Sequence, residues 1–142
     1  MIQFTVGAIA DYAAETGFGK LTIVGIFNRF NVEPSDGPVF LAESSLVFVG
    51  SASLTDGTQH TAVIALEDAD NTRITEISLP IEFVATGPGY PSLVHLILHL
   101  RNFSVPRVGD YAFRLRVLGK QCAEVPFTVT TRSELLGIGP NA

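Results

Sequence analysis

Residues 93–131 decide the fold, and they read LVHLILHLRNFSVPRVGDYAFRLRVLGKQCAEVPFTVTT. Apolar side chains occupy every second position in three runs, and turn residues separate the runs. The alternating residues are Val94, Leu96, Leu98 and Leu100, then Tyr111, Phe113, Leu115 and Val117, then Val125, Phe127 and Val129. A period of two indicates strands with one buried face, and several such strands joined by turns predict an antiparallel sandwich or barrel.

Five more strands are expected upstream, near residues 2–9, 20–30, 44–53, 59–67 and 73–85. The segment 10–19 is expected to be a loop or one short helical turn. The strand over 20–30 is apolar on both faces, so we expect it to be central in its sheet. Asp56-Gly57 predicts a tight hairpin turn, and Pro80 predicts an edge or bulged strand, because proline donates no ladder hydrogen bond.

The fold class that follows is all-β, an antiparallel two-sheet sandwich of about eight strands, immunoglobulin-like or C2-like. Tyr111 follows Gly109-Asp110 at the start of a strand, as a tyrosine that braces the corner between two sheets does in many immunoglobulin-like domains. We expect one domain over residues 1–131, followed by an irregular tail over 132–142.

The composition favours a folded chain that does not bind nucleic acid in general. Hydrophobic residues make up 46% of the chain and charged residues 16%, so apolar surface is ample. The net charge of −5 argues against a nucleic-acid partner. Residues 1–90 hold 11 acidic and 3 basic groups, whereas residues 91–142 hold 3 acidic and 6 basic groups. This asymmetry predicts complementary charges, either within the fold or toward another protein.

The chain begins without a basic segment and a long apolar core, and no stretch approaches the ~20 apolar residues of a membrane-spanning helix. We therefore expect a cytoplasmic protein that makes no contact with a membrane. The single cysteine, Cys122, is expected to be a small half-buried apolar residue.

Two groups of segments together resemble a known family. One group is Ala10-Asp11-Tyr12-Ala13 with Gly19-Lys20-Leu21-Thr22-Ile23-Val24-Gly25-Ile26-Phe27. The other is Leu100-Arg101-Asn102-Phe103, Pro106, Gly109-Asp110-Tyr111-Ala112-Phe113, Gly119 and Pro126-Phe127-Thr128-Val129. Their order and spacing, over roughly residues 3–130, resemble an uncharacterised family of small bacterial β-sandwich proteins, a domain of unknown function. The resemblance implies a stand-alone bacterial sandwich and brings no activity, cofactor or catalytic residue.

Several catalytic and ligand-binding patterns are absent from the sequence. Gly19-Lys20 follows a glycine turn, but a P-loop needs Ser or Thr directly after the lysine, and Leu21 stands there. His95 and His99 lie four apart on a strand, hence roughly 13 Å apart, too far for one metal ion. No Gly-x-Ser-x-Gly motif occurs. We expect no enzyme, no catalytic residue and no cofactor.

The best candidate for a binding surface lies on two of the C-terminal strands. If the leucine row faces the core, His95, Ile97, His99 and Arg101 face outward, and the same logic turns Arg114 and Arg116 outward on the following strand. Should these strands be neighbours, they form one face of His, Arg and aliphatic groups without a carboxylate. Such a mixture is typical of protein interfaces, although an ordinary solvated sheet face has the same composition.

The sequence thus predicts a non-enzymatic binding or assembly module that acts on a protein partner or on itself. Contact would be made through this face or through an edge strand. The alternative is a ligand- or calcium-binding sandwich that uses its end loops, with Asp68 and Asp70 as the first metal ligands. The turn Asp68-Ala69-Asp70-Asn71 equally fits a hairpin turn whose side chains only support the backbone.

Overall fold

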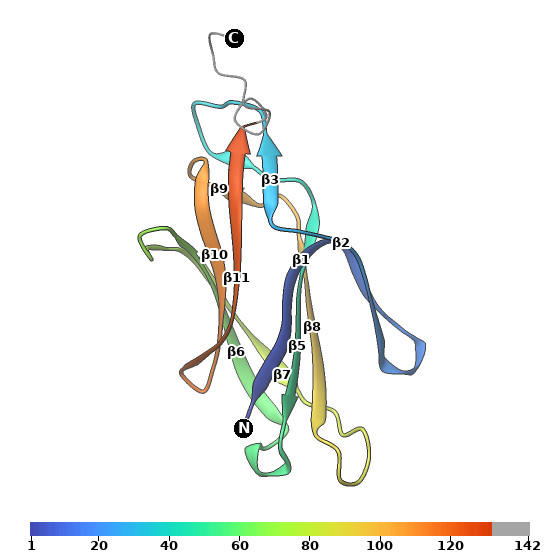
Figure 1. Ribbon diagram of the computed structural model, residues 1–142. Coiled ribbons are helices and arrows are strands. Elements are labelled where there is room, and N and C mark those ends of the chain that lie inside the picture. The colour runs from blue at the N-terminus through green and yellow to red at the C-terminus, as the bar shows by residue number, and fades with distance from the viewer. Residues whose placement is uncertain (132–142) are drawn as a thin grey trace.

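The three alternating runs form three strands, β8 (Ser92–Leu100), β10 (Gly109–Val117) and β11 (Lys120–Thr131). The computed structural model describes residues 1–131 (Figure 1), so the expected tail over 132–142 lies outside the described residues. The other longer strands are β1 (Gln3–Thr16), β2 (Lys20–Phe27), β5 (Ser44–Ala52), β6 (Gln59–Asp68) and β7 (Arg73–Glu82). Three short strands are β3 (Arg29–Val32), β4 (Val39–Phe40) and β9 (Ser104–Val105).

Two sheets form the sandwich. Sheet A has the order β2-β1-β5-β8, and sheet B has the order β3-β11-β10-β6-β7. All pairs are antiparallel except β3 with β11, and β4 pairs with β9 in a separate two-stranded sheet. The predicted all-β antiparallel sandwich is confirmed. The described residues 1–131 hold eleven strands in place of about eight, because the three short strands have too few alternating residues to be recognised in the sequence.

The inner faces of both sheets pack into one hydrophobic cluster. Phe48 and Leu46 from sheet A meet Phe113 and Leu115 from sheet B, and all four are nearly inaccessible to solvent. Tyr111 stacks on Phe127 with ring centroids 5.6 Å apart. These rows are the ones that the period of two assigns to the core.

Tyr111 also braces the corner where the chain enters β10. Its hydroxyl donates a hydrogen bond of 2.5 Å to the carbonyl of Arg107, four residues upstream. A buried tyrosine that bonds back to the preceding connection in this way is the tyrosine corner of sandwich domains. The predicted bracing role is confirmed.

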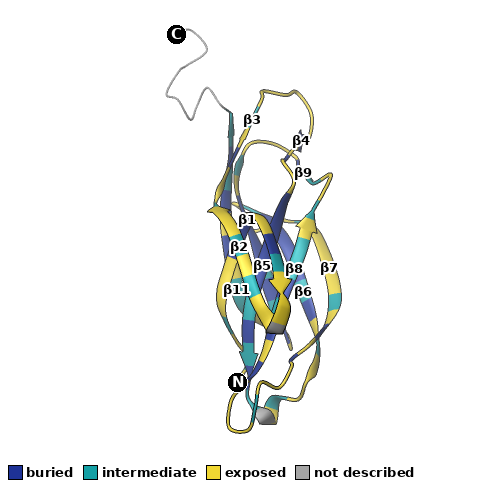
Figure 2. Cartoon of the chain, turned by 90° about the vertical axis from the view of Figure 1, so that its right-hand side faces the viewer, coloured by how far each residue is buried: buried dark blue, intermediate teal, exposed yellow. Residues whose placement is uncertain are grey.

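The first hairpin differs from the prediction. Residues 10–16 continue β1 and pair with β2, so most of the expected loop is strand, and only Gly17–Gly19 forms a 3-10 turn. The strand predicted to be central ends at Phe27, where the chain crosses to β3 in sheet B. β2 is the outermost strand of sheet A, and Figure 2 shows it exposed along most of its length. Val24 and Ile26 are 52% and 66% exposed, so the prediction of a doubly buried strand is wrong.

Two connections further define the sandwich. Asp56-Gly57 does not close a hairpin, because the 3-10 turn Leu54–Asp56 carries the chain from β5 in sheet A to β6 in sheet B. Gly57 has a positive φ of +78°, a conformation that glycine adopts without strain. Pro80 lies on β7, the last strand of sheet B, so its predicted edge position is confirmed. Among residues 1–131, no helix is long and apolar enough to cross a bilayer.

Candidate functional site

The predicted His/Arg face is divided between the two sides of the sandwich. β8 pairs with β5 in sheet A, whereas β10 lies between β6 and β11 in sheet B. The connection over residues 101–108 crosses from one sheet to the other, so the two strands are not neighbours. The outward direction of the six residues agrees with the alternation, but the single continuous face is wrong.

On sheet A, the histidines of β8 are engaged by neighbouring elements. His95 Nδ1 lies 2.6 Å from Glu15 Oε1, which comes from the first hairpin, and the His95 side chain is only 12% exposed. His99 Nδ1 lies 3.3 Å from the hydroxyl of Ser45 on β5. Ile97 is half-buried between them. The hairpin of β1 and β2 therefore covers part of the face that the sequence predicts to be open.

Arg101 ends this row and remains largely in solvent. Its Nε lies 3.0 Å from Glu43 Oε1, and the two side chains are 73% and 69% exposed. An ion pair so exposed contributes little to stability and is easily exchanged for another. The charge of Arg101 is thus exposed at the C-terminal end of β8.

On sheet B, Arg114 and Arg116 surround a buried glutamate. Glu67 lies on the neighbouring strand β6, and its side chain is only 7% exposed. Arg114 Nη1 lies 3.5 Å from Glu67 Oε1, and Arg116 Nη2 lies 3.5 Å from Glu67 Oε2. Arg114 also reaches Glu124 on β11 at 3.4 Å. The predicted absence of a carboxylate from this face is wrong, because both arginines pair with Glu67.

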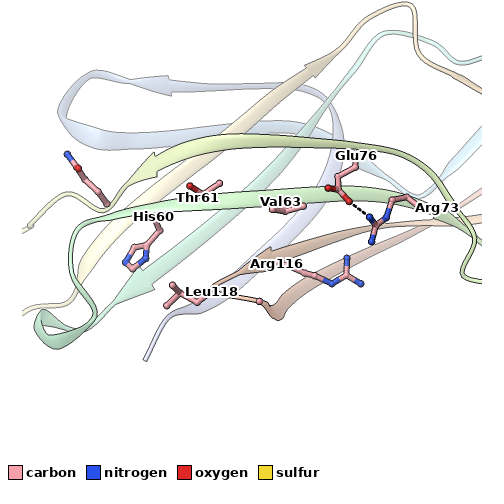
Figure 3. Close-up of a pocket in the computed structure, with 9 residues that line it drawn as sticks. His60, Thr61, Val63, Arg73, Glu76, Arg116 and Leu118 are labelled. Carbon is pink, nitrogen blue, oxygen red and sulfur yellow. Dashed lines mark ion pairs between the residues drawn. The ribbon is translucent and has the colours of Figure 1, made fainter.

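A shallow hollow of about 650 Å³ lies beside this network on the outer face of sheet B (Figure 3). Arg73 and Glu76 form an ion pair at one end of it, and His60 lies at the other. The residues that line the hollow are Gln59, His60, Thr61, Val63, Arg73, Glu76, Arg116, Leu118 and Gly119. Each arginine here already has a carboxylate, so the hollow offers no free positive charge to an anion.

The acidic turn between β6 and β7 supports its own backbone. Asp68 Oδ1 accepts hydrogen bonds of 2.9 Å from the amides of Asp70 and Thr72. Asp68 Oδ2 lies 3.7 Å from Arg107. Over residues 1–131, no group of three or more His, Cys, Asp and Glu side chains could hold a metal ion. Asp68 and Asp70 are thus placed as a hairpin turn requires. Asp56, another acidic turn residue, lies at the opposite end of β6 and so is far from them.

Charge pairing across the fold accounts for part of the asymmetry in the sequence. Glu43, Glu67 and Asp68 from the acidic first part pair with arginines from the last third. Asp56, also in the acidic first part, pairs instead with the N-terminal amine, which lies 2.5 Å from its Oδ2. That ammonium group, together with the Ser53 hydroxyl, lowers the pKa of Asp56 to about 2.

The edges of the sheets offer a second kind of site. β7 is blocked by Pro80, and β3 has only four residues. β2 carries Lys20 at its start, and Gly25, at φ +71°, interrupts its extended backbone. Proline, lysine, short length and local distortion are the devices by which proteins prevent strand addition.

β8 has none of these devices. From Val94 to Leu100 it pairs only with β5, and within the described residues no strand lies hydrogen-bonded on its other side. Only an isolated bridge between Val84 and Leu93 closes the sandwich there. The segment contains no Pro, Lys, Arg, Asp or Glu. Its backbone is therefore an open template for another strand.

A hollow of about 540 Å³ lies at the N-terminal end of β8. Its acidic groups are Glu15, from the first hairpin, and Glu82, from the end of β7. The remaining lining is largely apolar and includes Val84, Leu93, Val94 and His95, with Gly19 and Thr86. No periodicity in the sequence indicates this hollow, because three separate segments form it.

A family model matches residues 5–130, and its description is a family of unknown function, DUF6941. The chain belongs to this family, which confirms the predicted resemblance to an uncharacterised domain family. No curated protein matches the chain.

Solved structures of other proteins are similar to this chain. One is an alkylpurine DNA glycosylase, AlkC, from Pseudomonas fluorescens, bound to DNA containing an abasic site analog. It is 9% identical with a TM-score of 0.49, and the match covers 91% of this chain and 30% of that one. Another is an immunoglobulin-like protein from Pseudomonas aeruginosa, 14% identical with a TM-score of 0.42, over 91% of this chain and 96% of that one. The chain thus spans less than a third of the glycosylase.

Proposed function

We propose that this chain, a member of a family of unknown function, is a non-enzymatic binding module that takes an extended segment of a protein onto the free edge of β8. The observation that carries the proposal is the contrast between β8 and the three other outermost strands of sheets A and B within the described residues 1–131. Each of those carries a blocking device, whereas β8 has seven consecutive residues open along one side.

Strand addition fits the chemistry of this edge. Main-chain hydrogen bonds supply affinity, and alternate side chains of the added segment supply specificity by packing on the two faces. The inner row of β8 ends in Leu98 and Leu100, which are only half-buried. Ile77 of β7 points to the same interior and is 44% exposed. An added strand would cover apolar surface that the sandwich leaves open on this side.

Two other strand segments lack a hydrogen-bonded neighbour on one side, but they do not offer the same site. The first part of β1 is unpaired on the side opposite β5, and so is the first part of β11 on the side opposite β10. These two segments pack against each other, and a Cβ added at Gly7 would lie 3.0 Å from Val125 Cγ2. Pro126 further blocks β11.

The proposal is tested with a lysine in the open edge. His99→Lys places a charge at an exposed position of β8, and Ser78→Lys places the same charge on β7, which Pro80 already blocks. We expect a protein captured from the native cell lysate to protect the amides of residues 94–100 from hydrogen exchange. His99→Lys is expected to lose that protein and Ser78→Lys to retain it. Retention by both variants, with β8 still exchanging freely, would contradict the proposal, as would the absence of any bound protein, a second copy included.

A further inference from the structure

We infer that the strand added to β8 is β8 of a second copy of this chain, antiparallel to the first about a two-fold axis. The inference rests on the proposed function and names its partner. The two copies of sheet A would then form one continuous eight-stranded sheet, a width that natural sheets commonly reach.

The side chains of β8 meet the condition that such symmetry imposes. In a two-fold interface the same surface faces itself, so a charged side chain near the axis meets a like charge. With Ile97 on the axis, Leu96 lies opposite Leu98, and Val94 lies opposite Leu100. His95 lies opposite His99, and no Lys, Arg, Asp or Glu occurs between residues 92 and 100. The strand can therefore pair with itself without charge repulsion.

Charges flank the strand at its two ends, and their signs are complementary. The antiparallel register that centres on Ile97 sets Arg101 of one copy opposite Leu93 of the other. Leu93 lines the hollow that holds Glu15 and Glu82. Glu82 makes no ion pair with any residue in 1–131, and Arg101 is held only by the exposed Glu43. Each copy thus brings a largely exposed arginine to an acidic, partly apolar hollow of the other.

Two such contacts form at once, because the axis repeats the first at the opposite end of the pair. They also favour this register, since Leu93, which lies opposite Arg101, is one of the β8 residues that line the hollow. The apolar centre of the strand supplies contact area, and the charged ends select antiparallel pairing.

The test measures the molar mass of the full chain by light scattering and sedimentation over a range of concentrations. We expect a concentration-dependent dimer at twice the 15.2 kDa of the chain. Arg101→Glu is expected to raise the dissociation constant at least about tenfold, because two attractive contacts both become repulsive. Adding Glu82→Arg to Arg101→Glu reverses both charges and is expected to restore most of the affinity. Arg29→Glu changes the net charge equally on β3, away from β8, and is expected to have no effect.

Two results would overturn the inference. One is a monomer at every concentration. The other is a dimer that neither His99→Lys nor Arg101→Glu weakens, since another surface would then hold it. A monomer that still takes a different protein onto β8, in a manner lost with His99→Lys, refutes the second copy as occupant and leaves the proposed function standing. A monomer that captures nothing refutes both.

Discussion

Replacing Glu67 by glutamine tests whether the charged network on sheet B stabilises the sandwich. Glu67→Gln keeps the shape of the side chain and removes its charge, so Arg114 and Arg116 lose the carboxylate that lies between them. Both arginines already have one buried N–H group without a hydrogen-bond partner, Arg114 Nε and Arg116 Nη1. The substitution therefore leaves two half-buried cations, of which Arg114 keeps Glu124 as an ion-pair partner.

The magnitude follows from the distances and the burial. Each guanidinium–carboxylate pair at 3.5 Å is worth about 5 kcal/mol of Coulomb energy at an effective dielectric constant of 20. Removing the charge also removes several kcal/mol of desolvation penalty from Glu67. The two arginine side chains are 18% and 30% exposed, so water screens part of the remaining attraction. We expect a net loss of about 1–3 kcal/mol in the free energy of unfolding, as for hydrogen bonds to charged groups.

The matched control is Glu124→Gln, which removes an equal charge at 3.4 Å from the same Arg114. Glu124 is 43% exposed, so a loss of at most about 0.5 kcal/mol is expected. Urea unfolding measures both variants, and the melting temperature of Glu67→Gln should fall by roughly 2–12 °C. The reasoning is refuted if Glu67→Gln unfolds like the unmodified chain, or if Glu124→Gln costs as much.

Three further predictions concern the corner, the hairpin and the acidic turn. Tyr111→Phe removes the hydrogen bond to the Arg107 carbonyl and should lower the free energy of unfolding by about 1–2 kcal/mol in urea titrations; an unchanged value would show that the corner is held by packing alone. Gly25→Ala places a Cβ against the carboxylate of Asp11 at a position with φ +71°, so it should destabilise the chain by about 1 kcal/mol or more and speed amide exchange in the first hairpin; exchange at the original rate would contradict the strain. The pKa of Asp56 is lower in the folded chain, about 2, than its usual 3.8, so its contribution to stability is complete above pH 3.8 and is lost as the pH falls toward 2. Urea titrations between pH 5 and 2 should show a steeper loss in the original chain than in Asp56→Asn, and parallel curves would contradict the pairing with the N-terminal amine.

The sequence predicts the strands and their buried rows well, because alternation is a local property. The side chains of Leu96 and Phe113 face the core as predicted, since a strand turns successive side chains to opposite faces. Pro80 also identifies its strand as an edge, because the lack of an N–H group is a property of the residue itself.

Which strands are neighbours in a sheet is not a local property of the sequence, and the predicted strand neighbours are wrong. Arg114 and His99 are both outward-facing, yet they lie on different sheets, because the connection between their strands crosses the sandwich. The apolar run around Val24 fits a central strand equally well, and only the hairpin with β1 shows that it lies outermost. Hydrophobic pattern gives the face of a residue, whereas pairing depends on contacts between distant segments.

Glu67 had a weak signal in the sequence. It continues the apolar strand run Ala62–Leu66, and Arg114 and Arg116 are spaced two apart on one face. Recognising the network requires that β6 and β10 are neighbours, which no local pattern indicates. The open edge of β8 was beyond prediction for the same reason, because a strand is an edge only by its place in the sheet order.

Residue-resolved hydrogen exchange of β8, in dilute and in concentrated protein, tests the central claim most directly. The account predicts that the outward-pointing amides between Val94 and Leu100 are protected only in the concentrated sample, while the amides of β7 exchange equally in both. Equal exchange of β8 at the two concentrations, or new protection on β7 in its place, would contradict it.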